Sequence, residues 1–169
     1  MTDFNREFLE MADIVPAFIP VDMQTGNNGS NWLNMAKCDR VLCVLFKAVG
    51  TAGDNPVFTL NQATDNQGTG SKALTFTKAR TKIGAIATAA NQIWTTVTQA
   101  AAGTYTPTSA ASAALIAVEI RATDLDLANG FNHINLTIPD VGSNAQLGCA
   151  FYIPYAVRQP QATLPTFLD

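Results

Sequence analysis

Apolar and polar side chains alternate with a period of two along most of the chain, and this pattern restricts the fold more than any other feature. In VFTLNQA (57–63), Phe58 and Leu60 alternate with Thr59 and Asn61, as in a half-buried strand. Comparable patterns occupy residues 39–48, 72–83, 93–99, 113–122, 133–139 and 148–157. Because Gly, Asn, Asp and Pro separate these segments, we expect an all-β fold, a jelly-roll-like antiparallel β-sandwich with seven to eight strands.

Three of the expected strands carry finer predictions. Residues 39–48 are apolar on both faces, which predicts a central strand that is covered on two sides. Along residues 72–83 the apolar face becomes cationic near Thr77, so we expect a β-bulge or an exit from the core there. Pro154 has no backbone N–H, and it therefore predicts a sheet edge or a bulge in the last strand.

A chain of 169 residues is long enough for one domain with a substantial core. We expect residues 1–22 to form a short helix, from Asp3 to about Ala12, followed by an arm that two prolines keep extended. Residues 23–158 should form the β-sandwich domain. Residues 159–169, with two further prolines, should form an extended C-terminal tail.

Charged residues make up only 14% of the chain and the net charge is −3, so no basic field attracts nucleic acid. A weakly charged surface loses little free energy when a partner covers it, which indicates protein contact. No apolar run approaches the roughly 20 residues of a membrane span, and acidic residues near the N-terminus argue against an export signal. Cys38, Cys43 and Cys149 lack zinc spacing and predict reduced, mostly buried thiols in a protein made in the cytoplasm.

The stretch DNQGTGSK (65–72) resembles a phosphate-binding loop but lacks its spacing. Ser71 separates Gly70 from Lys72, and Ala73 stands where a serine or threonine would coordinate magnesium. A strand pattern follows, whereas a phosphate loop precedes a helix. We therefore expect a turn in which the glycines supply positive φ angles.

The other candidate chemical sites lack partners. Asp124 and Asp126 lie in an oxygen-rich turn, but the residues that complete an EF-hand loop are missing. His133 is the single histidine, and a surface or hydrogen-bonded role is expected for it. Glu119 should form a surface pair with Arg121. We therefore expect no enzymatic activity, no cofactor and no bound metal.

Lys78, Arg80 and Lys82 are the one patterned charge feature, three cations on a single strand face. They suit the acidic surface of a partner protein. The alternative, which we favour, is a solvated edge that charge protects against aggregation.

Two long stretches of the chain resemble known proteins. The opening TDFNREFLEMADIVPAFIPVDMQTGNNGSNWLNMAKCDRVLCVLFKAVGTAGDNPVFTLNQATD (2–65) and the later VEIRATDLDLANGFNHINLTIPDVGSNAQLGCAFYI (118–153) are similar to small structural proteins encoded beside the major capsid protein of tailed bacteriophages. The role implied is that of a head decoration, or cement, protein. Such proteins are β-rich and often trimeric, and they bind the outer surface of the expanded head, where they tie major capsid protein subunits together.

Extended termini can reach neighbouring subunits, so our hypothesis is that one end of the chain makes the bridging contacts. The candidates are Phe4, Phe8 and Leu9 in the N-terminal arm, or Leu164 and Phe167 in the tail. The alternative is that both ends cover the sandwich of their own subunit.

Two other functions remain open. The chain is also compatible with a phage neck, tail or baseplate protein of the same fold class. A sugar-binding sandwich is the alternative from a different class, and Trp32 and Trp94 are the aromatic residues that could stack on a glycan.

Overall fold

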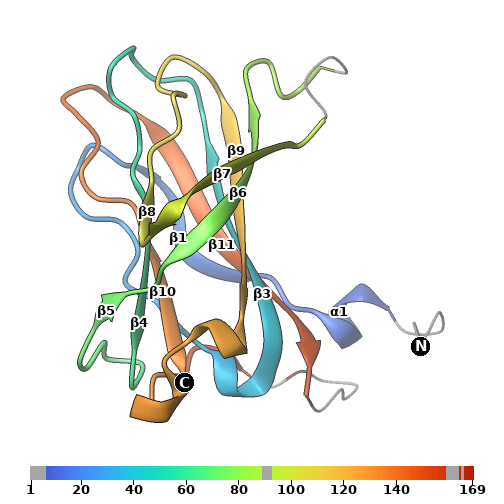
Figure 1. The fold of residues 1–169 in the computed structure, drawn as a ribbon. Coiled ribbons are helices and arrows are strands. Elements are labelled where there is room, and N and C mark those ends of the chain that lie inside the picture. The colour runs from blue at the N-terminus through green and yellow to red at the C-terminus, as the bar shows by residue number, and fades with distance from the viewer. Residues whose placement is uncertain (1–6, 89–92, 159–163, 165) are drawn as a thin grey trace.

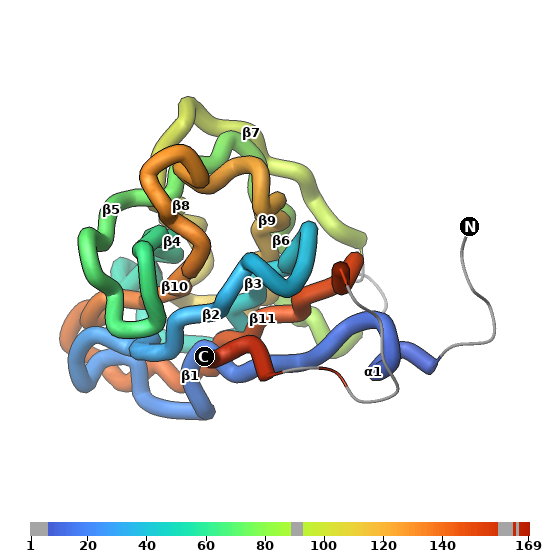
Figure 2. The backbone as a smooth tube through the Cα atoms, turned by 90° about the horizontal axis from the view of Figure 1, so that it is seen from below, coloured from blue at the N-terminus to red at the C-terminus, as the bar shows by residue number. Residues whose placement is uncertain are grey.

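The computed structural model describes residues 7–88, 93–158, 164 and 166–169. These residues form eleven strands and one α-helix, and the strands pair in two antiparallel sheets that face each other (Figures 1 and 2). The predicted all-β sandwich is therefore confirmed, and the sheets do not close into a barrel. Within the described ranges, no helix is long and apolar enough to cross a membrane.

The larger sheet has six strands and the smaller has five. In spatial order the larger sheet contains β1 (Val15–Asp22), β11 (Leu147–Val157), β3 (Cys38–Lys47), β9 (Ala114–Arg121), β6 (Phe76–Ile83) and β7 (Thr95–Ala102). The smaller contains β2 (Trp32–Asn34), β10 (His133–Thr137), β4 (Phe58–Ala63) and β5 (Lys72–Ala73), with β8 (Thr104–Tyr105) paired to β4. The helical turns are α1 (Phe8–Met11), η1 (Met35–Lys37), η3 (Ala122–Asp124) and η4 (Leu127–Asn129).

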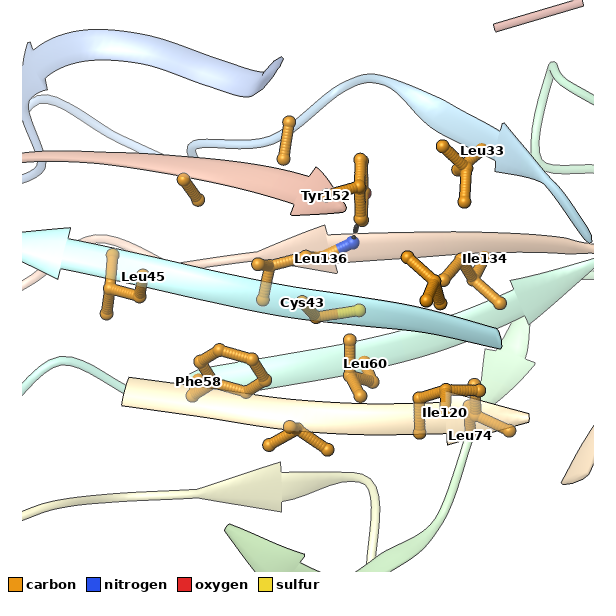
Figure 3. Packing of buried hydrophobic residues seen from close by; sticks show 14 of the residues in the cluster. Leu33, Cys43, Leu45, Phe58, Leu60, Leu74, Ile120, Ile134, Leu136 and Tyr152 are labelled. Carbon is orange, nitrogen blue, oxygen red and sulfur yellow. Dashed lines mark hydrogen bonds between the residues drawn. The ribbon is translucent and has the colours of Figure 1, made fainter. Parts of the chain in front are cut away.

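The core lies between the two sheets (Figure 3). Cys43 and Leu45 of β3 point inward and are fully buried, as are Phe58 and Leu60 of β4. Burying one such aliphatic or aromatic side chain contributes roughly 1.5–3 kcal/mol to the free energy of folding. The side chains between the two sheets therefore supply most of the stability.

Tyr152 of β11 ties the two sheets together through a buried hydroxyl. Its Oη accepts a hydrogen bond from the backbone N of Leu136 on β10 (2.7 Å) and donates to the carbonyl of Asn31 (3.1 Å) (Figure 3). Burial raises the pKa of the Tyr152 hydroxyl above its usual range. Both hydrogen-bonding capacities of this hydroxyl are used, as a buried polar group requires.

The predicted irregularity near Thr77 is confirmed. The pairing of β6 with β7 shifts register between Phe76 and Lys78. Phe76 and Ala79 are both buried although three positions separate them, which a regular strand does not allow. The bulge turns Lys78 and Arg80 to the outward face of the sheet.

Two predictions about individual strands are wrong. β3 is central, but the smaller sheet covers only its inward face, and Phe46 on its outward face is 45% exposed. Pro154 lies in an interior strand, because β11 sits between β1 and β3 and its pairing with β3 continues through Pro154 without a bulge. The ladder between β1 and β11, which contains two register shifts, ends at Tyr152, so Pro154 lies beyond it.

The N-terminal helix and the strand count also differ from prediction. Glu7 is extended (φ −70°, ψ 155°) and α1 is a single turn, because Ala12 already forms a bridge with Tyr155 of β11. Eleven strands replace the expected seven to eight, since β2, β5 and β8 have only two or three residues each and show no clear alternation.

Candidate interaction surface

The outward face of the six-stranded sheet is apolar at its centre. The strand register places Phe46 of β3 beside Cys149 of β11 and Leu115 of β9, and Val44 beside Phe151. These side chains share one face because cross-strand partners in an antiparallel sheet point the same way. The smaller sheet packs against the opposite face (Figure 2). This apolar surface therefore faces away from the core.

At one end of this face lies a hollow of 360 Å³, which we call the apolar groove. Its lining includes Pro20 of β1, Phe46, Ile86, Leu147 and Cys149. Leu147 is 60% exposed at its rim. An exposed apolar hollow is one of the features by which contact surfaces are recognised.

Lys47 adjoins the groove but points into the sandwich. Lys47 is 0% exposed. Its Nζ donates to the backbone carbonyls of Ser109 (2.7 Å), Ser112 (2.5 Å) and, at longer range, Ala110 (3.4 Å). It forms no ion pair with a described carboxylate, and burial lowers its pKa to about 8. These hydrogen bonds from Lys47 therefore hold the 109–112 loop over the end of the core.

Lys47 was not among the residues predicted from the sequence, although the strand pattern contains a signal for it. Val41, Cys43 and Leu45 share one strand parity, and Lys47 is the next residue of that parity. In a strand with period two, this lysine had to point inward unless a bulge intervened.

The three cations of β6 share the outward face, as the sequence predicts. Lys78 and Arg80 are exposed, and Arg80 Nη1 lies 3.2 Å from Thr96 Oγ1 on the edge strand β7. Lys82 Nζ lies 4.9 Å from the ring centroid of Trp94, a cation–π distance.

The surface pair predicted for Glu119 is made with a different arginine. Glu119 Oε1 accepts from Arg40 Nη1 on β3 at 2.5 Å, and this hydrogen bond raises the pKa of Arg40. Arg121, two residues along the same strand, uses its backbone N to bond Asp124. The diagonal neighbour across two paired strands is closer than the residue two positions away on one strand.

Residues 7–14, which we call the N-terminal arm from here on, have little contact with their own subunit. The arm is held beside β11 by the bridge between Ala12 and Tyr155 and by a bond from Asp13 N to the Pro154 carbonyl (3.1 Å). Phe8 is 54% and Leu9 60% exposed. Phe4, the third aromatic or aliphatic candidate at this end of the chain, lies outside the described residues.

The end of the C-terminal tail, in contrast, packs on its own subunit. Phe167 is buried in the core, and its carbonyl accepts from Asn34 N (2.8 Å). The Lys37 ammonium pairs with the Asp169 carboxylate and lowers its pKa. Leu164 packs partly against the same core. Phe167 therefore makes the intramolecular contact that was the alternative, and we do not retain it as a bridging residue.

His133 has partners for both ring nitrogens, in keeping with the hydrogen-bonded role expected for it. Nδ1 lies 2.6 Å from Asn132 Oδ1, and Nε2 lies 3.1 Å from the Asp169 carbonyl. No group of three or more His, Cys, Asp or Glu side chains with metal-binding geometry occurs among the described residues.

Residues 65–72 form the predicted turn. Asp65 Oδ1 accepts from the backbone N of Thr69 and of Gln67, both at 2.9 Å, and these bonds lower the Asp65 pKa. Gly68 has φ +81°, and a Cβ there would lie 2.9 Å from the Trp32 ring. Glycine is therefore required both by the backbone conformation and by the close approach of Trp32.

The lysine at the end of this turn is occupied by a carboxylate. Lys72 Nζ forms an ion pair with Asp126 and lies 4.0 Å from the ring centroid of Phe131. The hydrogen bond from Lys72, followed by that from Asn129, lowers the Asp126 pKa. The sequence offered Asp126 as a possible calcium ligand. In this structure its carboxylate is instead the counter-ion of Lys72.

The comparisons with known proteins add no relative to this picture. No protein-family model, no curated protein and no solved structure matches the chain.

Proposed function

We propose that this chain is a capsid decoration (cement) protein of a tailed bacteriophage. In this role it is a non-enzymatic virion component, made in the host cytoplasm, that binds the outer surface of the expanded head. The observation that supports an interaction role is the apolar groove with its exposed rim, Phe46 and Leu147. The capsid assignment rests on the sequence resemblance of residues 2–65 and 118–153.

The proposal is consistent with the physical character of the groove. Covering apolar surface stabilises a complex by roughly 25 cal/mol for each Å² removed from water. A low fraction of charged residues, 14%, keeps the desolvation cost small. A ligand that binds only the expanded lattice of the major capsid protein stabilises that lattice by mass action. A homotrimer would match the local threefold positions of an icosahedral shell.

The first experiment is quantitative mass spectrometry of purified particles of the phage that encodes this chain. A ratio to the major capsid protein within a few-fold of unity supports a decoration protein. A trace ratio supports a neck, tail or baseplate protein instead. Absence from the particle contradicts any virion role and returns attention to glycan binding.

The second experiment tests the groove itself. The double variant Phe46→Asp, Leu147→Asp places two charges in the groove and should weaken binding to expanded shells by about tenfold or more, since 1.4 kcal/mol corresponds to tenfold. Leu127→Asp is the matched control, because Leu127 is 51% exposed on η4, outside the groove lining. Equal binding by both variants, with unchanged melting temperatures, contradicts the groove as the contact.

A further inference from the structure

A second hollow on the outward face lies beside the cations of β6, and we call it the cationic hollow. Its volume is 180 Å³. It is lined by Leu42 of β3, Ala117 and Glu119 of β9, and Lys78 and Arg80 of β6. The register places Arg80 directly beside Ala117 and Leu42 beside Glu119, so apolar and charged side chains alternate around it.

The hollow has a positive net charge, because its lining contains two cations and one carboxylate. The Glu119 carboxylate is engaged by Arg40 at 2.5 Å. Neither Lys78 nor Arg80 forms an ion pair with a carboxylate in the part of the chain that the structure describes. The hollow therefore offers an apolar floor and two cations, which suits an apolar side chain flanked by carboxylates.

The N-terminal arm has this chemistry. In EFLEMADI (7–14), an acidic residue (Glu7, Glu10, Asp13) stands at every third position and the residues between them are apolar. Met11 is 38% and Ile14 56% exposed, in addition to the exposed Phe8 and Leu9. No residue of α1 is buried. A single helical turn that buries nothing gains almost no stability from its own subunit, because helices this short depend on packing.

The arm cannot reach the cationic hollow of its own subunit. It is anchored at Ala12 beside β11, whereas the hollow extends from β3 to β6. Ala12 pairs with Tyr155 on the side of β11 away from β3, and neighbouring strands are about 5 Å apart, so Ala12 lies roughly 19 Å from β6. One helical turn from Ala12 to Phe8 spans only about 6 Å. In Figures 1 and 2, α1 also projects away from both sheets.

We propose that the N-terminal arm of one copy of this chain docks in the cationic hollow of a second copy. Phe8 and Leu9 contact the floor formed by Leu42 and Ala117. The carboxylates of Glu7 and Glu10 face Lys78 and Arg80. The contact joins two different surfaces, so it is heterologous: it gives a ring where the rotation between copies closes and an open chain of copies where it does not.

The test is sedimentation velocity of the full chain, without shells, so its result is independent of the proposed capsid role. The wild-type protein should associate at low salt and dissociate as salt rises, because exposed charges are screened. Two charge-reversal variants are compared. One is Lys78→Glu, Arg80→Glu in the hollow, and the other is Glu7→Lys, Glu10→Lys in the arm.

Each charge-reversal variant alone should raise the dissociation constant by about tenfold or more. An equimolar mixture of the two should associate again, because each acidic arm then meets a cationic hollow and each basic arm meets an acidic one. The matched control Lys78→Arg, Arg80→Lys keeps both charges and should associate like the wild type.

Three outcomes overturn the proposal: a wild-type protein that stays monomeric at high concentration, variants that associate like the wild type, or a mixture that fails to associate. A photo-crosslinker at position 8 gives an independent readout. It should capture β3 or β9 of a second copy. Capture of the same molecule alone contradicts the docking proposed here.

Discussion

Phe46 and Lys47 are neighbours on β3. Their environments are the reverse of what their chemistry suggests, because the aromatic side chain is exposed and the lysine is buried. Phe46 points outward and is 45% exposed at the rim of the apolar groove, whereas Lys47 points inward and is fully buried. The period of the strand sets both directions. Because Cys43 and Leu45 fill the core, the next inward position falls to Lys47.

The difference shows what each face of the six-stranded sheet needs. The inward cation needs acceptors, and the carbonyls of Ser109 and Ser112 supply them. The outward aromatic side chain receives no cover from the smaller sheet, and in the proposed function another molecule covers it. We therefore expect the inward face to determine stability and the outward face to determine binding.

The largest predicted effect comes from truncating one phenylalanine on each face. Phe76 of β6 is 7% exposed and meets Phe58 edge to face, with ring centroids 6.2 Å apart. Phe76→Ala should lower the free energy of unfolding by about 3 kcal/mol, since it removes buried surface and leaves a cavity. Phe46→Ala should lower it by less than about 1 kcal/mol, because the ring is already half exposed.

Urea unfolding of both variants measures these changes. Equal losses at the two positions would mean that the groove is part of the core and would remove the distinction between the faces. The shell-binding assay supplies the reverse comparison, because only the Phe46 variant should bind more weakly.

A smaller effect is expected from Lys47→Met, which keeps the length of the side chain and removes the charge. It leaves the carbonyls of Ser109 and Ser112 without their donor and should cost about 2 kcal/mol at neutral pH. Lys78→Met removes the same charge from the outward face and is the matched control. Its free energy of unfolding should stay within about 0.5 kcal/mol of the wild type.

The pH dependence of this variant has a definite sign. The Lys47 pKa is about 8 in the folded protein against 10.5 for the unfolded chain, so between these values the unfolded state binds more protons. Stability of the wild type relative to Lys47→Met should therefore rise with pH, by about 1 kcal/mol between pH 7 and pH 9. A difference that stays constant over this range would mean that the three carbonyls keep Lys47 charged at no cost.

The period-two pattern was sufficient to predict the sandwich, the principal strands and the bulge near Thr77. It could not show which face of β3 is covered, because Leu45 and Phe46 are both large and apolar, yet Leu45 is fully buried and Phe46 is 45% exposed. The short strands β2, β5 and β8 are too brief to show alternation, and tertiary pairing alone defines them.

The candidate contact residues were predicted less completely. The cations of β6 were visible in the sequence as an alternating row, as were the exposed apolar residues of the arm. The apolar groove was not, because Pro20, Ile86 and Leu147 come from distant segments and meet only through the fold. In the sequence, Phe167 has the features of an apolar anchor in an extended tail. In the structure it is buried in the core of its own subunit.

The smallest predicted effect compares two cysteines on the two faces. Cys43 points inward and is fully buried, whereas Cys149 is half-buried and lines the apolar groove. Burial raises the pKa of both thiols, so alkylation of the native protein should be slow at neutral pH. Cys149 should nevertheless react first, because Cys43 becomes accessible only when the protein opens.

The same labelling reaction connects the outward face to binding. If the groove is the contact with the shell, expanded shells should slow alkylation of Cys149, as followed by mass spectrometry of its peptide. Cys149→Ser should abolish the faster reaction and serves as the control. Because Cys149 lies beside Phe46 in the strand register, unchanged labelling on shells would mean that the exposed Phe46 stays uncovered there, and the contact would have to lie elsewhere.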